Sequence, residues 1–215
     1  MGSEMCIRDR ERTLSSSVLT APETDADSTT DRKTAIIDCD IHNELPSIDR
    51  LFPYLADHWI DYIRGVGFGG PGSTDYPYGA PITARPGSIP EEGGPAGSEL
   101  NLVQDQVLDP WGTEVGILNC CYRVQSIHAD DLSCALATAV NQWQIDNWLE
   151  AEPRLRGSLV VPSHLPQRAA EEIERYGGHP GFVQIVLPVR SYMTYGKRFY
   201  DPLYAPAVEH DLVVG

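Results

Sequence analysis

The chain has 215 residues, and with 41% hydrophobic residues it can bury the core of one domain or slightly more. Its net charge of −15 and pI near 4.6 exclude nucleic acid and anionic membrane surfaces as partners, since both would repel it. No apolar run is long enough for a transmembrane helix or a signal peptide, and five cysteines without a Cys-x-x-Cys pair suggest neither a disulfide framework nor a zinc finger. We therefore expect a cytoplasmic protein.

Residues 1–33 form a polar leader. Its serine, threonine and aspartate runs cannot bury enough apolar surface to fold, which predicts disorder. The first ten residues, MGSEMCIRDR, resemble translated sequencing adapter and are set aside as non-native. The folded domain is expected at 34–215.

The domain opens with an apolar strand at 35–39, which is short and typical of a strand buried on both faces. Apolar residues at three- and four-residue steps then predict a helix over 46–63. Glycine and proline dominate residues 65–97, and a segment of this length is interpreted as a flap over a functional site.

Strands and helices alternate through the rest of the chain. This alternation predicts a parallel α/β sheet, and no strand is followed by a Gly-rich phosphate loop, which favours a barrel over a nucleotide-binding fold. A (β/α)8 TIM barrel needs eight units, and this chain supplies four to five, so we expect its amino-terminal half. The predicted strands are 115–120, 157–161, 182–187 and 212–214, and the predicted helices are 99–108, 130–150 (capped by Asp130 and Asp131), 166–177 and 201–208.

Asp40 and His42 follow the first strand, two residues apart, so their side chains should project to the same side. Carboxylate oxygen and imidazole nitrogen are good ligands for a divalent ion such as zinc or manganese. The carboxyl ends of barrel strands are also where catalytic groups lie in this fold. Asp38 is expected to point away and is a weaker candidate.

The surrounding sequence resembles the amidohydrolase-related family of metal-dependent hydrolases and decarboxylases. The resemblance runs in order through 34–215 and is carried by 36–42, Pro46-Ser47, 51–55 with Trp59 and Tyr62, 108–112, 153–157, 169–175 and 181–188.

The resemblance implies that Asp40 and His42 are the metal ligands of the first strand. Many relatives have His-x-His or Glu-x-His at this point, so the aspartate leaves the metal open between zinc, the first choice, and manganese. The family's other ligands, a histidine ending strand five and an aspartate ending strand eight, would lie beyond Gly215. That aspartate is also the family's usual proton-transfer group, so no catalytic residue is assigned.

The first functional hypothesis is a hydrolase that attacks a small-molecule amide, ester or lactone with metal-activated water. The alternative is a non-oxidative decarboxylase of the same family, and the second alternative is a non-catalytic ligand-binding barrel. The fragment alone is predicted to be inactive. The sequence leaves open whether the full-length protein forms a homo-oligomer.

Other polar residues favour structural roles. His128 and His164 follow strands on the active-site face, where a solvated or loop-stabilising role is favoured over contact with substrate. We expect an ordinary polar loop, rather than the lining of a substrate pocket, at Arg190, Tyr192, Tyr195 and Lys197. We expect a solvated helix face at Glu171, Glu172 and Glu174.

Overall fold

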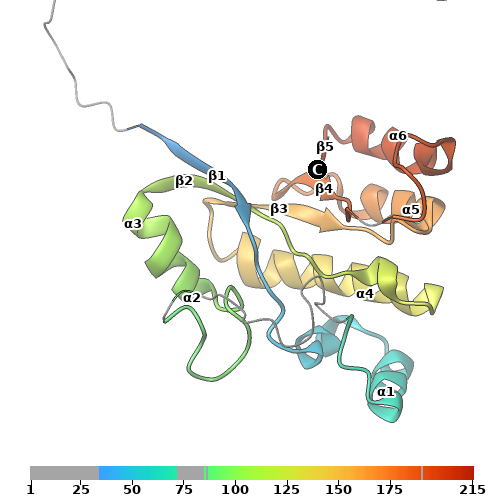
Figure 1. The fold of residues 1–215 in the computed structure, drawn as a ribbon, viewed down its shortest axis with the longest axis horizontal. Coiled ribbons are helices and arrows are strands. Elements are labelled where there is room, and N and C mark those ends of the chain that lie inside the picture. Colours follow the sequence, from blue (N-terminus) through green and yellow to red (C-terminus); the bar gives the residue numbers. More distant parts are fainter. Residues whose placement is uncertain (1–33, 72–84, 86, 190) are drawn as a thin grey trace, which may run out of the picture. The chain divides into compact units, whose positions relative to one another are not determined.

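The sheet at the centre of the structure has five parallel strands in the order β1-β2-β3-β4-β5. The computed structural model describes residues 34–71, 85, 87–189 and 191–215, and Figure 1 shows the path of the chain. A doubly wound sheet changes strand order at a switch point, whereas a barrel keeps the order of the chain. The prediction of a partial (β/α)8 barrel is therefore confirmed. The strands are β1 (Ile36–Ile41), β2 (Thr113–Leu118), β3 (Leu155–Val160), β4 (Phe182–Val186) and β5 (Val213–Val214).

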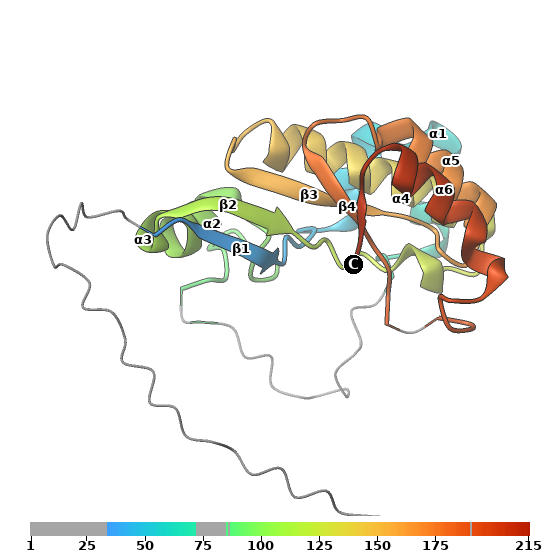
Figure 2. The same ribbon diagram turned by 90° about the horizontal axis from the view of Figure 1, so that it is seen from above.

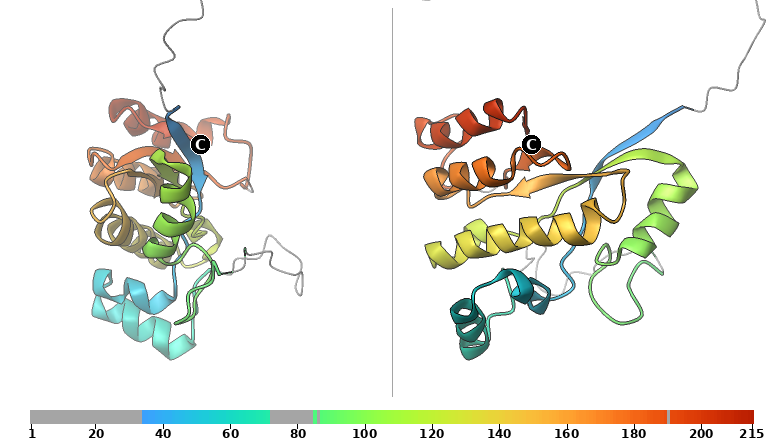
Figure 3. Two further views of the ribbon diagram at one scale, coloured as in Figure 1. Left: turned by 90° about the vertical axis from the view of Figure 1, so that its left-hand side faces the viewer. Right: turned by 180° about the vertical axis from the view of Figure 1, so that it is seen from behind.

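Helices connect the strands and cover one face of the curled sheet (Figure 2). Helix α4 packs against β3 and α5, and α5 packs against α6, so these three lie side by side in chain order (Figure 3). None of the helices in the described residues combines the length and the apolar character needed to cross a membrane. The α-helices are α1 (Asp57–Val66), α2 (Leu100–Val103), α3 (Asp109–Trp111), α4 (Asp130–Gln144), α5 (Pro166–Tyr176) and α6 (Asp201–Glu209); η1 (Ile48–Tyr54), η3 (Val124–Ser126) and η5 (Arg198–Tyr200) are 3-10 helices, and η2 (Gln104–Leu108) and η4 (Ile145–Leu149) are π-helices.

The apolar stripe predicted for the helix after β2 forms the centre of the core. Leu136 and Val140 of α4 are fully buried, as are Leu159 of β3 and Ile185 of β4. The core of residues 35–215 thus lies between the helix layer and the sheet, as the alternating pattern requires.

Two expectations about the first unit are wrong. Residues 46–63 form η1 followed by α1 rather than one helix, because the backbone is extended at Leu55 and Ala56, between the end of η1 and the start of α1. The first strand is not buried on both faces: Ile37 is 60% exposed, since β1 lies at an edge of the described sheet.

The predicted helix cap is also wrong. Ala129 is the N-cap of α4, and no side chain caps its amide groups. Asp130 and Asp131 instead occupy the first turn, where their charges interact favourably with the helix dipole. The leader 1–33, with its first ten residues, and residues 72–84 and 86 of the expected flap lie outside the described residues.

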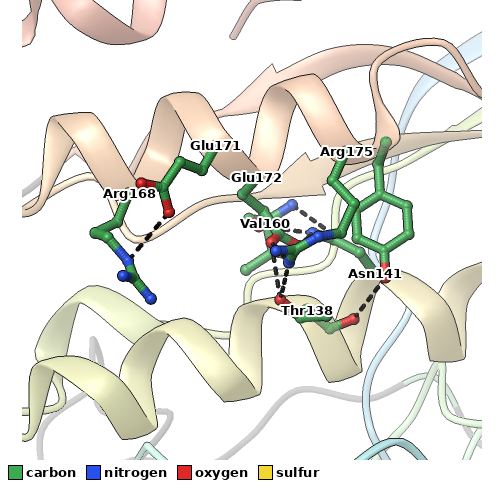
Figure 4. Close-up of polar contacts among 8 residues, drawn as sticks. Thr138, Asn141, Val160, Arg168, Glu171, Glu172 and Arg175 are labelled. Carbon is green, nitrogen blue, oxygen red and sulfur yellow. Dashed lines mark hydrogen bonds and ion pairs between the residues drawn. The ribbon is translucent and has the colours of Figure 1, made fainter.

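A closed polar network, which we call the helix-layer network, joins α4, α5 and β3 (Figure 4). The Glu172 carboxylate is 4% exposed and accepts hydrogen bonds from Thr138 Oγ1 (2.8 Å) and Asn141 Nδ2 (2.9 Å), while Arg175 pairs with it at 2.6 Å. Asn141 also exchanges two 2.9 Å bonds with the backbone of Val160. Solvation of Glu172 was therefore a wrong expectation: it shares the inner face of α5 with Ala169 and Ile173, which are buried, whereas Glu171 and Glu174 are exposed.

Candidate metal centre

Asp40 and His42 come together at the carboxyl end of β1. His42 Nε2 lies 3.0 Å from Asp40 Oδ1, and the two side chains are 53% and 73% exposed. Ile41 between them is buried, so the chain alternates at this point and holds the two polar groups on the same side. The geometry that the sequence predicted for this pair is present.

A β-bulge lies directly beside the pair. Asp38 pairs with Gly116, and Ile41 pairs with Leu118, so three steps along β1 match two along β2. A bulge of this kind re-aims side chains and is common next to functional sites. Asp38 does not point away as expected: its Oδ1 accepts a 3.1 Å bond from the Asp40 backbone N–H, and it lines a hollow of about 230 Å³ together with Asp40 and His42.

The side chain of Asn119, which follows β2, donates to the β1 residues at the site. Its Nδ2 donates to Asp40 Oδ1 at 2.9 Å and to the backbone carbonyl of Cys39 at 3.2 Å. The hydrogen bond from Asn119 lowers the pKa of Asp40; partial burial opposes this effect, and His42 adds to it. Asp40 is therefore held as a carboxylate, the form that binds a cation.

Two further polar side chains complete this arrangement from β3 and β4. Ser158 Oγ donates to Asn119 Oδ1 at 2.7 Å, and Gln184 Nε2 donates to Asn119 Oδ1 at 2.8 Å and to Ser158 Oγ at 2.7 Å. We call Asp40, His42, Asn119, Ser158 and Gln184 the strand-end network.

The strand-end network borders a hollow of about 660 Å³. Polar groups of the network line it together with Arg123, and Gly215 lies beside Gln184 at its margin. Its apolar wall consists of Tyr122, Val160, Val161, Val186, Leu187, Pro188 and Val189. A hollow of this size and mixed lining suits a small organic molecule.

The described end of the expected flap packs against the loop that carries His42. The backbone N–H of Glu44 donates to the carbonyl of Gly97 at 3.0 Å. Gly97 has a φ of +82°, and a Cβ there would lie 2.4 Å from the carbonyl oxygen of His42. Only glycine fits this position, because both the backbone conformation and the close approach exclude a side chain.

The pair has the geometry of two ligands on one ion. Two atoms that bind one ion at about 2.1 Å lie about 3.0 Å apart when their bonds meet at right angles, as in an octahedral site, and about 3.4 Å apart in a tetrahedral zinc site. The 3.0 Å between Asp40 Oδ1 and His42 Nε2, which are also within hydrogen-bond distance of each other, is close to the octahedral value. Among the residues that the structure describes, no group of three or more His, Cys, Asp and Glu side chains could hold an ion. The residues present therefore fit part of a metal site.

The other candidate residues do not join this site. His128 is exposed, and His164 is largely buried, with Asp130 3.7 Å away and a pKa lowered mainly by burial. Neither lines the hollow. In the loop after β4, Tyr192 and Lys197 are exposed, Tyr195 donates to the carbonyl of Pro188 at 2.8 Å, and Arg190 lies outside the described residues.

Sequence reasoning missed Asn119, Ser158 and Gln184. A usable signal existed, since Gln184 is the one polar residue of β4, Ser158 is followed by the apolar end of β3, and Asn119 is the first polar residue after β2. A polar residue in a buried strand needs a partner, so its presence indicates a polar network at the strand ends.

Comparisons with known proteins agree with the fold. The family profile described as Amidohydrolase matches residues 37–215. Two structures of 5-carboxyvanillate decarboxylase from Novosphingobium aromaticivorans, with manganese and a nitrobenzoic acid derivative, are similar at a TM-score of 0.58 and 22% identity. Each match covers 85% of this chain, and it covers 50% of the first structure's chain and 49% of the second's.

A 2,6-dihydroxybenzoate decarboxylase from Rhizobium is similar at a TM-score of 0.49 and 20% identity, over 54% of this chain and 39% of that one. This chain thus spans about half, or less, of the length of these solved structures. No protein among the curated sequences matches it.

Proposed function

Because this chain belongs to the amidohydrolase family, we propose that its protein is a metal-dependent decarboxylase of small aromatic carboxylic acids. Hydrolysis of a small-molecule amide, ester or lactone is the second candidate. The observation that carries the proposal is the Asp40–His42 pair, 3.0 Å apart in the lining of a hollow of about 660 Å³.

Asp40 and His42 would hold a divalent ion through one oxygen and one nitrogen. Such an ion supplies Lewis-acid chemistry, polarising an oxygen atom bound next to it. A complete barrel would add ligands from strands outside these 215 residues. Zinc was the first choice from the sequence, but manganese gains support from the carboxylate ligand and from the manganese in the 5-carboxyvanillate decarboxylase structures.

The lining of the hollow favours an aromatic acid. Val160, Val161 and Leu187 offer an apolar wall against which a ring can pack, and Arg123 places a positive charge at the same hollow. In decarboxylation, the bond between the ring and the carboxylate breaks, carbon dioxide leaves, and the ring carbon keeps the electron pair and takes up one proton. No oxidant or reductant is needed.

We rank the two candidate reactions in the opposite order from the ranking that the sequence suggested. The sequence placed hydrolysis first, and the name of the matching family supports it. The structural neighbours with the same half-barrel are decarboxylases, which supports decarboxylation. Both reactions use the same pair of ligands, so an assay must decide between them.

The first test is metal content. The protein expressed from its complete gene should bind about one equivalent of Mn²⁺ or Zn²⁺, and Asp40→Ala and His42→Ala should each abolish it. Asp49→Ala and His128→Ala are matched controls, because both residues are exposed and lie away from the hollow. Full metal content in both site variants would contradict the metal site and favour a non-catalytic barrel.

The second test separates the reactions. Release of carbon dioxide from 5-carboxyvanillate and related hydroxybenzoates should depend on the metal, and cleavage of a panel of amides, esters and lactones should not occur. Metal-dependent cleavage of that panel without carbon dioxide release would exchange the two candidates.

A further inference from the structure

Four neighbouring strands contribute to the strand-end network, but only the first carries the proposed ligands. Gln184 of β4 and Ser158 of β3 are linked to each other and to Asn119 after β2, and Asn119 is linked to Asp40 of β1. All of these bonds are between 2.7 and 2.9 Å long. Asp40 is thus connected across the sheet to a strand three positions away.

Donor and acceptor bookkeeping fixes the orientation of the Asn119 amide. Its Oδ1 accepts two hydrogen bonds, from Ser158 Oγ and Gln184 Nε2, and only an oxygen can accept both. Its Nδ2 must then face β1, where it donates to two acceptors, Asp40 Oδ1 and the carbonyl of Cys39. A flipped amide would place two donors against Nε2 of Gln184 and an oxygen against the Asp40 carboxylate.

We propose that Asn119 is a positioning residue for the metal site: its amide hydrogen fixes Asp40 Oδ1 beside His42 Nε2, and Ser158 and Gln184 keep that amide from turning. This inference rests on the proposed function, because it takes Asp40 as a ligand. Asn119 itself is not a ligand, since its only cation-binding atom, Oδ1, already accepts two hydrogen bonds.

The exposure of the pair explains why such an anchor is needed. Asp40 is 73% exposed at its side chain, so packing alone does not select one rotamer. A ligand that must find its orientation during binding loses affinity in proportion to the entropy it gives up. Outer partners that orient metal ligands contribute about 10- to 100-fold in metal affinity in other proteins.

The test is a Mn²⁺ titration of the metal-free protein expressed from its complete gene, with the thermal midpoint measured beside it. Asn119→Leu, which has similar volume but no donor, should weaken Mn²⁺ binding by about 10- to 100-fold. Asn147→Leu is the matched control: Asn147 lies in η4, where it donates to Tyr54 Oη and the Trp143 carbonyl, away from the hollow. It should leave Mn²⁺ affinity unchanged.

Milder variants keep the inference testable if Asn119→Leu does not fold. Ser158→Ala and Gln184→Met each remove one donor to Asn119 Oδ1 without touching a ligand or adding charge. Each should weaken Mn²⁺ binding about two- to fivefold, as expected for one hydrogen bond. A purely structural role would lower the thermal midpoint of the metal-free protein and leave Mn²⁺ affinity unchanged.

The outcomes separate the inference from the function on which it rests. Wild-type affinity in folded Asn119→Leu, or in both Ser158→Ala and Gln184→Met, would overturn the role of Asn119 while leaving the metal site intact. Wild-type metal content in Asp40→Ala and His42→Ala would overturn the metal site itself.

Discussion

The strand-end network and the helix-layer network both join several elements through polar side chains, and they differ in how far they are closed. In the helix-layer network, both carboxylate oxygens of Glu172 have partners, and the carboxylate is 4% exposed. In the strand-end network, every group from Gln184 to Asn119 has a partner, but Asp40 and His42 remain 73% and 53% exposed at its end. A network whose groups are all satisfied stabilises the fold, whereas one that ends in exposed ligand groups keeps them available for binding.

The largest effect on metal binding should come from a change in the exposed pair at the end of the strand-end network. Asp40→Ala is expected to reduce metal affinity by at least about 100-fold, since it removes a ligand rather than an outer partner. The free energy of unfolding of the metal-free protein should change by less than about 0.5 kcal/mol, because the side chain is mostly exposed. Metal titration and urea unfolding measure the two quantities; a large loss of stability would show that Asp40 acts mainly in folding.

The opposite pattern is expected for the closed network. Glu172→Ala should lower the free energy of unfolding by about 3 kcal/mol, because it leaves Asn141 and Thr138 without their buried partner. Metal affinity should stay the same. Glu171→Ala is the control, since Glu171 is exposed and pairs with Arg168 at 3.4 Å, and it should cost less than about 0.5 kcal/mol. Equal effects of both variants in urea unfolding would contradict the assignment.

A third carboxylate, before β3, sharpens the comparison through pH. Hydrogen bonds from Arg154 and Gln104 lower the pKa of Glu152 to about 2. Because the folded-state pKa is lowered, the stabilisation is present above pH 4.5 and is lost as the pH falls toward 2. Glu152→Gln should therefore cost about 2 to 3 kcal/mol at pH 7, limited by the 30% exposure of Arg154. In urea unfolding, a difference that persisted below pH 2 would point to packing instead of charge.

The smallest of these effects concerns the segment beside the open network. Gly97→Ala should cost about 1 to 3 kcal/mol, through the positive φ and the close approach to the His42 carbonyl. Gly93→Ala is the matched control: its φ is +93°, but a Cβ there meets nothing within 4 Å. The difference between the two in thermal unfolding isolates the contact with His42, and equal costs would show that the contact is unimportant.

Periodicity predicted the parts of the fold that depend on apolar burial. The stripe containing Leu136 and Val140 and the alternation of strands with helices both follow from side-chain spacing, and the structure has both. The break between η1 and α1 shows the limit of this reasoning, since extended backbone at Leu55 and Ala56 divides a segment whose apolar spacing is continuous. Spacing likewise brought Asp40 and His42 together, because they are neighbours in sequence.

The partners of Asp40 could not be paired from the sequence. Asn119, Ser158 and Gln184 are 79, 118 and 144 residues away from Asp40 along the chain, as their numbering shows. They meet only because the strands follow one another in the sheet with a particular register. The burial of Glu172 could not be predicted for the same reason. The sequence of α5 shows that its helix carries both apolar and charged residues, but only the packing of α5 on α4 determines that this one carboxylate is covered.

The bonds between Asn141 and Val160 have a consequence for motion. The Val160 amide donates to a side chain of α4, and its carbonyl accepts from the same side chain, so the end of β3 is tied to the helix layer as well as to its neighbouring strands. The amide hydrogen of Val160 can exchange with water only when β3 and α4 move apart from each other. Its exchange rate should therefore report opening of the whole strand-helix unit and not local fraying.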